Sequence, residues 1–210
     1  DGLGDALRRE YHREVGDYLE RSGGEQAANA AAVARHYDGA GEPRRALPFH
    51  LAAGRHARAL YAPREARRHL EQAREEADLW WLEEPAGKAR ELRVQVLREL
   101  GLLEQTAGRY EQAEILFGGA ASLLTPMLEE TQRAELERLR GECLYHGGQP
   151  EAAARAFATA LAHCPSGERA EHARILRSRA YMQARANDWE GALASCRAAL
   201  VLSEGVAADR

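Results

Sequence analysis

Small and hydrophobic residues recur along this chain at a spacing typical of helices that pack in pairs. In residues 101–120, GLLEQTAGRYEQAEILFGGA, a glycine is followed by alanines twelve and nineteen residues later, and Phe117 lies between the two alanines. A small residue lets a neighbouring helix approach closely, and alanines about two turns apart form a flat strip on one helix face. The spacing therefore predicts an internal repeat of helix pairs. It recurs at Ala34, Ala46, Ala53; Gly54, Ala66, Ala73; Gly141, Ala153, Ala160; and Ala180, Ala192, Ala199.

With Tyr37 three residues after Ala34, and Pro165 five residues after Ala160, the pattern resembles the tetratricopeptide repeat (TPR). The resemblance implies an all-α fold, a right-handed superhelical solenoid of antiparallel helix pairs with about ten helices. Glu104 and Gln183 depart from the family pattern at the place of Tyr37. The copies are expected near residues 27–60, 47–80, 94–127, 134–167 and 173–204.

Three segments are expected along the chain. Residues 1–24 are expected to form an N-terminal amphipathic helix, because one stripe along it is hydrophobic: Leu3, Leu7, Tyr11, Val15, Tyr18 and Leu19. The repeat domain covers residues 25–204, and residues 205–210 are expected to form a frayed tail.

Composition restricts the class of protein. The 210 residues are 45% hydrophobic and 30% charged, which is typical of a globular chain, and no apolar run is long enough to span a membrane. The formal net charge of −4 gives no general attraction to nucleic acid or acidic membranes, so nucleic acid is disfavoured as a partner. The three cysteines are too scattered for a disulfide framework and are expected in the core of a cytoplasmic protein.

No catalytic, metal-binding or cofactor-binding motif is found in the sequence. Phosphate-binding loops, zinc-protease motifs and nucleophile elbows are all missing, so we expect no enzyme, no cofactor and no metal. His50 occupies the place of Phe117 in its repeat and is expected to be a core histidine with satisfied hydrogen bonds. Trp80 and Trp81 are expected to pack over a neighbouring helix, although an exposed contact patch stays an alternative.

The TPR resemblance also implies a concave groove lined by the first helix of each pair. At the groove positions the sequence is rich in arginine and contains two tyrosines, although arginine is also the common surface residue of this chain. Guanidinium groups bind carboxylates and tyrosines supply contact area, so the groove is expected to bind an acidic protein or peptide segment. The residues expected to contact the partner are Arg98, Arg138, Tyr145, Arg174, Arg177, Tyr181 and Arg185.

Residues 33–75 carry a narrower resemblance, through the run HY…AG…ALP…AG…A. This segment resembles the first repeats that follow the nucleotide-binding domain of large bacterial signalling ATPases of the STAND type, which include transcriptional regulators. The resemblance implies an interaction scaffold or sensor within a larger signalling protein. The alternative is a repeat domain that senses a small-molecule inducer in an ATP-dependent transcriptional regulator. Self-association through an end of the stack is also open.

Overall fold

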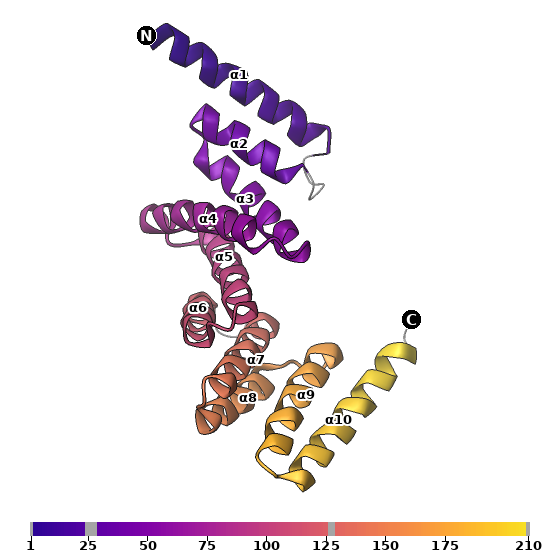
Figure 1. The fold of residues 1–210 in the computed structure, drawn as a ribbon. Helices are drawn as coiled ribbons and strands as arrows, with labels where there is room; N and C mark the ends of the chain where they lie inside the picture. The colour runs from indigo at the N-terminus through magenta and orange to yellow at the C-terminus, as the bar shows by residue number, and fades with distance from the viewer. Residues whose placement is uncertain (1, 24–28, 126–128, 209–210) are drawn as a thin grey trace. The chain divides into compact units, whose positions relative to one another are not determined.

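The computed structural model describes residues 2–23, 29–125 and 129–208, and this part of the chain is all α-helical (Figure 1). The all-α class and the series of helices predicted from the repeat are confirmed. The helices are α1 (Gly2–Arg21), α2 (Ala30–Ala40), α3 (Pro43–Ala59), α4 (Pro63–Glu83), α5 (Gly87–Thr106), α6 (Tyr110–Leu123), α7 (Glu130–His146), α8 (Pro150–His163), α9 (Arg169–Arg185) and α10 (Trp189–Ala208).

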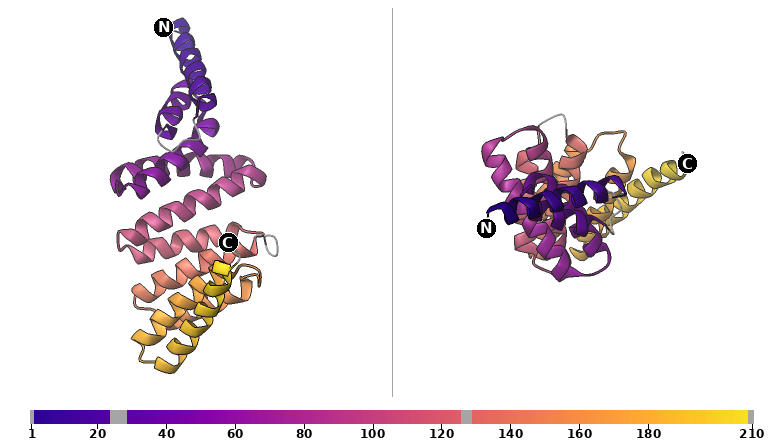
Figure 2. Two further views of the ribbon diagram at one scale, coloured as in Figure 1. Left: turned by 90° about the vertical axis from the view of Figure 1, so that its right-hand side faces the viewer. Right: turned by 90° about the horizontal axis from the view of Figure 1, so that it is seen from above.

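The chain divides into two compact units, residues 1–103 and 104–210, and the division falls within the last turn of α5. In unit 1, α1 packs against α2, α2 against α3, and α3 against α4. In unit 2, α7 packs against α6 and α8, and α10 packs against α9, which it accompanies side by side in Figures 1 and 2. Each unit therefore consists of neighbouring helices in contact, as a helical repeat requires.

The small residues of the repeat lie where helices approach most closely. A Cβ atom built on Gly54 would lie 2.6 Å from the side chain of Leu70, and one on Gly141 would lie 2.8 Å from the ring of Phe157. The paired alanines of the second helices, such as Ala66 and Ala73, are fully buried. Close helix approach at small residues, the physical basis of the repeat spacing, is thus present in both units.

The N-terminal helix differs from a simple amphipathic element. Leu7, Tyr11 and Tyr18 of its predicted stripe are exposed, whereas Val15 and Leu19 are half-buried and Leu19 packs against the core cluster that contains Tyr37. The face that meets α2 also contains Gly16, where an added Cβ would lie 3.0 Å from the ring of Tyr37. Glycine permits this close approach, and polar side chains around Tyr37 complete the contact.

Two further details concern helix ends and cysteines. Helix α10 continues to Ala208, into the segment for which the sequence predicted a frayed tail. Cys143 is buried as predicted, whereas Cys196 is exposed and does not belong to the core.

Within the described ranges, no helix combines the length and apolar character needed to cross a membrane.

Candidate functional site

Three of the residues predicted to contact a partner come together in unit 2. Tyr145 near the end of α7, and Arg177 and Tyr181 on α9, line one pocket of about 350 Å³. We call this cavity the tyrosine pocket. Its other lining residues are Glu142, His146, Phe157 and Ser178.

Aromatic rings form one side of the tyrosine pocket. The rings of Tyr145 and Tyr181 meet edge to face, with centroids 5.9 Å apart and an interplanar angle of 82°. The ring centre of His146 lies 6.4 Å from that of Tyr181. The His146 ring also stacks on the ring of Tyr110 in α6, with centres 5.0 Å apart. The side chain of Tyr181 is 54% exposed, so this cluster presents ring surface to solvent. Rigid aromatic surface of this kind is enriched in protein-binding sites.

The carboxylate of the pocket is already neutralised from within unit 2. Glu142 accepts hydrogen bonds from Arg138 Nη1 at 2.9 Å, from Ser178 Oγ at 2.7 Å and from Gln105 Nε2 at 3.1 Å. Arg177, in contrast, is exposed and makes no ion pair or hydrogen bond with any residue in the described part of the chain. The pocket therefore combines aromatic surface with one uncompensated positive charge.

The structure places Arg138 inside the protein, between α7 and α9. Its side chain is only 11% exposed, and Nε donates to Glu171 Oε1 at 2.6 Å while Nη1 donates to Glu142. Burial lowers the pKa of Arg138, but Glu142 and Glu171 outweigh this effect and the net pKa shift is upward. Arg138 thus joins two helices and has little surface to offer a partner.

Arg98 has a similar internal partner in unit 1. Its Nη1 atom lies 2.8 Å from Oε1 of Glu99, a residue that is 2% exposed. Arg55 Nε and Arg58 Nη2, from α3, each lie 3.0 Å from an oxygen of the same carboxylate. These three arginines compensate a buried glutamate, so much of their charge is directed inward.

The two remaining predicted residues lie outside the tyrosine pocket. Arg174 donates to Glu171 Oε2 at 3.2 Å and lines, with Arg177, a neighbouring cavity of about 440 Å³ between α9 and α10. Arg185, the last residue of α9, is exposed and shares no hydrogen bond or ion pair with the described residues.

Sequence reasoning missed two rings of the site and the acidic partners of its arginines. Tyr110 begins a second helix, outside the first-helix positions that define the groove, and His146 is adjacent to Tyr145 on α7. The sequence did not indicate that Glu99 and Glu171 are buried, because a charged residue is expected on the surface until its neighbours are known.

His50 is the core histidine that its place in the repeat predicted. It is buried, and it makes hydrogen bonds with His69 and Asp38 at 2.9 Å each. Trp80 and Trp81 are half-buried, with the guanidinium groups of Arg44 and Arg93 over their respective rings at 5.3 and 5.4 Å. Among the residues with assigned positions, no group of three or more histidine, cysteine or acidic side chains has the geometry to hold a metal ion.

Comparison with known proteins supports the fold. No family model matches the chain, and no curated protein sequence matches it. The crystal structure of BtubC (BKLC) from P. vanneervenii is similar, with a TM-score of 0.55 and 15% sequence identity over 97% of this chain and 90% of that chain. At this identity the similarity concerns the helical repeat-like fold alone.

Proposed function

We propose that this chain is a protein-interaction module of the TPR type that binds a peptide or protein segment at the tyrosine pocket. The observation that carries the proposal is the unpaired Arg177 beside Tyr145 and Tyr181, in a pocket whose own carboxylate is neutralised. A partner segment would place a carboxylate against Arg177 and an apolar side chain against the two tyrosine rings. The module acts by binding rather than by catalysis.

The wider role proposed for the module is that of a scaffold or sensor in a cytoplasmic bacterial signalling protein. This proposal depends on the resemblance of residues 33–75 to the first repeats of STAND-type ATPases. In such an arrangement, binding of the partner segment by unit 2 would change the activity of the catalytic parts of the larger protein or bring the partner next to them.

A displayed library of random peptides tests the proposal whatever the natural partner is. Peptides selected on the wild-type chain are expected to be enriched in an acidic residue near an apolar or aromatic residue. Arg177→Glu is expected to weaken their binding at least about tenfold, because a charge-assisted hydrogen bond is replaced by repulsion. Selected peptides that bind this variant as tightly as the wild type would contradict the proposal.

Arg155→Glu is the matched control. Arg155 is also exposed and lies on α8, and its side chain makes no ion pair with the described residues. The substitution changes the net charge by the same amount without touching the tyrosine pocket, so peptide binding is expected to persist.

One observation favours the alternative function, the sensing of a small molecule. Unit 1 contains a separate cavity of about 830 Å³, within the size range of ligand pockets, with cationic side chains on its wall.

A further inference from the structure

The cavity in unit 1 has an excess of positive charge. Four basic side chains line it, Arg21 from α1, Arg44 and Arg45 from α3, and Lys88 from the first turn of α5, together with the carboxylate of Glu20. We call it the basic cavity. Its volume of about 830 Å³ exceeds that of the tyrosine pocket.

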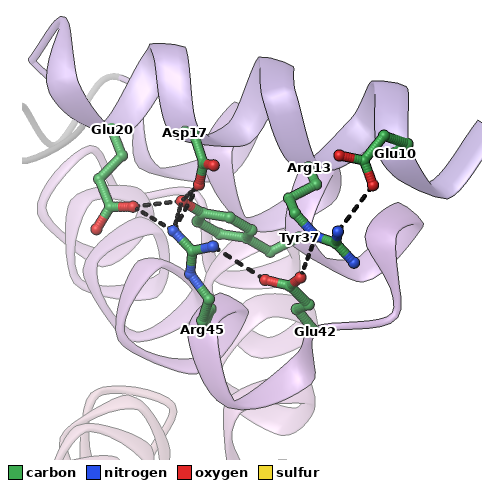
Figure 3. Close-up of polar contacts among 7 residues, drawn as sticks. All are labelled: Glu10, Arg13, Asp17, Glu20, Tyr37, Glu42 and Arg45. Carbon is green, nitrogen blue, oxygen red and sulfur yellow. Dashed lines mark hydrogen bonds and ion pairs between the residues drawn. The ribbon is translucent and has the colours of Figure 1, made fainter.

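Two of these charges are used inside the protein. Arg45 pairs with three carboxylates: Nη2 lies 2.6 Å from Asp17 Oδ1 and 3.1 Å from Glu20 Oε2, and Nη1 lies 3.0 Å from Glu42 Oε2 (Figure 3). Its Cζ atom lies 4.1 Å from the ring centre of Tyr37. Figure 3 shows that these side chains join α1 to α2 and to the start of α3. Glu20 therefore has an internal cationic partner, and three carboxylates share the charge of Arg45.

The other basic residues are less engaged. Arg44 is paired with Glu83 and lies over the ring of Trp80, with Cζ 5.3 Å from the ring centre. Arg21 and Lys88 are exposed and make no hydrogen bond or ion pair with the residues that the structure describes. Lys88 therefore faces this cavity without a direct partner, and Arg21 interacts with Asp17 only through electrostatic attraction, without a hydrogen bond or ion pair.

The remaining wall of the basic cavity is apolar. Pro48, Phe49 and the half-buried Trp80 line it, and Trp80 Nε1 donates to Glu84 at 3.2 Å. That hydrogen bond holds the indole in place. Aromatic surface beside two cations without a direct hydrogen bond or ion pair suits a ligand that carries both a planar ring and a negative charge.

We propose that the basic cavity binds a small aromatic phosphate of nucleotide size. A phosphate monoester carries close to two negative charges at neutral pH, which suits two cations, Arg21 and Lys88, that make no direct hydrogen bond or ion pair with the described residues. The aromatic ring of this ligand lies against Phe49 and Trp80. Inorganic phosphate alone would leave the apolar wall in water, and an uncharged ring would leave both cations without a counter-charge.

Intrinsic fluorescence and calorimetry of the whole chain test this proposal with AMP as the probe. The chain has three tryptophans, and only Trp80 lines the basic cavity among the described residues. AMP is expected to change the fluorescence, and Trp80→Phe to remove most of that change while calorimetry still detects binding. Adenosine and inorganic phosphate, titrated separately, are each expected to bind at least about tenfold more weakly than AMP.

Charge variants complete the test. Lys88→Gln and Arg21→Gln are each expected to weaken AMP binding about tenfold, because each removes one charge-assisted contact. Arg64→Gln is the matched control, since Arg64 is exposed on α4 and does not line the cavity. The proposal is overturned by no detectable AMP binding, by adenosine or phosphate binding as tightly as AMP, or by equal loss in the control.

Discussion

The Nδ1 atoms of His50 and His69 lie 2.9 Å apart in the interior of unit 1. The neighbours of this pair determine where the protons are. Arg68 Nη2 lies 3.1 Å from His69 Nε2, and a guanidinium can only donate, so His69 Nε2 accepts and its proton is on Nδ1. His50 Nδ1 then accepts from His69, and His50 Nε2 donates to Asp38 Oδ2 at 2.9 Å. Both histidines are therefore neutral in this arrangement.

Unit 1 is expected to lose stability in mild acid as a consequence. Burial is the largest cause that lowers the pKa of His69 below its usual 6.5. Repulsion from His50, in its protonated form, and from Arg68 lowers this pKa further, although Glu65 and Asp38 oppose the shift. The folded state therefore binds fewer protons than the unfolded state, and stability falls as the pH drops below about 6.5. His36 contributes in the same direction, because burial, His12 and Arg35 lower its pKa.

Urea denaturation at about pH 7.5 and about pH 5 measures this effect, in the range where histidine titrates. His69→Gln is expected to make the free energy of unfolding less dependent on pH across this interval, while His36 preserves part of the dependence. An unchanged pH dependence in His69→Gln would contradict the assignment of protons along the Arg68, His69, His50 and Asp38 chain.

Tyr37→Phe is expected to destabilise the contact between α1 and α2. The Tyr37 ring is fully buried. Its hydroxyl shares its one proton between the carboxylates of Asp17 and Glu20, and its oxygen accepts from Arg45 Nη2 at 2.5 Å. Removal of the hydroxyl leaves these groups without one partner, which costs about 1–2 kcal/mol.

Chemical denaturation gives that difference directly, and Tyr18→Phe supplies the control. Tyr18 is an exposed tyrosine on α1, so loss of its hydroxyl is expected to change the free energy of unfolding by less than about 0.5 kcal/mol. Equal effects of the two substitutions would show that the Tyr37 network does not stabilise unit 1.

Glycine-to-alanine substitutions test the close helix contacts. An alanine Cβ at Gly54 would lie 2.6 Å from Leu70, and at Gly141 2.8 Å from Phe157, so both substitutions are expected to destabilise the chain by about 1–3 kcal/mol. Gly118 lies within α6, and the nearest contact of an added Cβ is at 3.8 Å. Gly118→Ala is therefore expected to stabilise the chain by up to about 1 kcal/mol, because alanine favours helix. Thermal unfolding of the three variants shows which substitutions destabilise the chain and which one stabilises it.

These close contacts are also the part of the structure that the sequence predicted best. The repeat predicted that a small residue lets the paired helix approach closely, and Gly141 of α7 does lie against Phe157 of α8. Helices α3, α4 and α8 begin at Pro43, Pro63 and Pro150, because the fixed φ angle of proline suits the first position of a helix. Such features depend on local chemistry and on one neighbouring helix, so a periodic sequence is sufficient to predict them.

The candidate site could be predicted only in part. Tyr145, Arg177 and Tyr181 were found because their positions in the repeat place them on the same side of successive first helices. The inward pairing of Arg138 with Glu171 was not found, because it depends on which acids three-dimensional packing buries. The number of arginines at the groove positions does not show which of them pair with buried acids.

Arg138 and Arg177 should accordingly respond differently to charge reversal. Arg138→Glu would place a third carboxylate beside Glu142 and Glu171 in a largely buried site, with an expected loss of about 3–5 kcal/mol in the stability of unit 2. Arg177→Glu is expected to change the free energy of unfolding by less than about 0.5 kcal/mol, since the side chain is exposed. Denaturant titration of both variants measures the difference, and similar losses would refute the internal role of Arg138.

A charge swap between Arg177 and a selected peptide tests the central claim most directly. The dissociation constant is measured for wild type and Arg177→Glu, each with the selected acidic peptide and with its counterpart in which the acidic residue is replaced by lysine. We predict that each single change weakens binding at least about tenfold and that the two changes together restore most of the affinity, because opposite charges again face each other. Independent effects of the two changes, with no recovery in the double combination, would contradict the assignment of the tyrosine pocket as the partner-binding site.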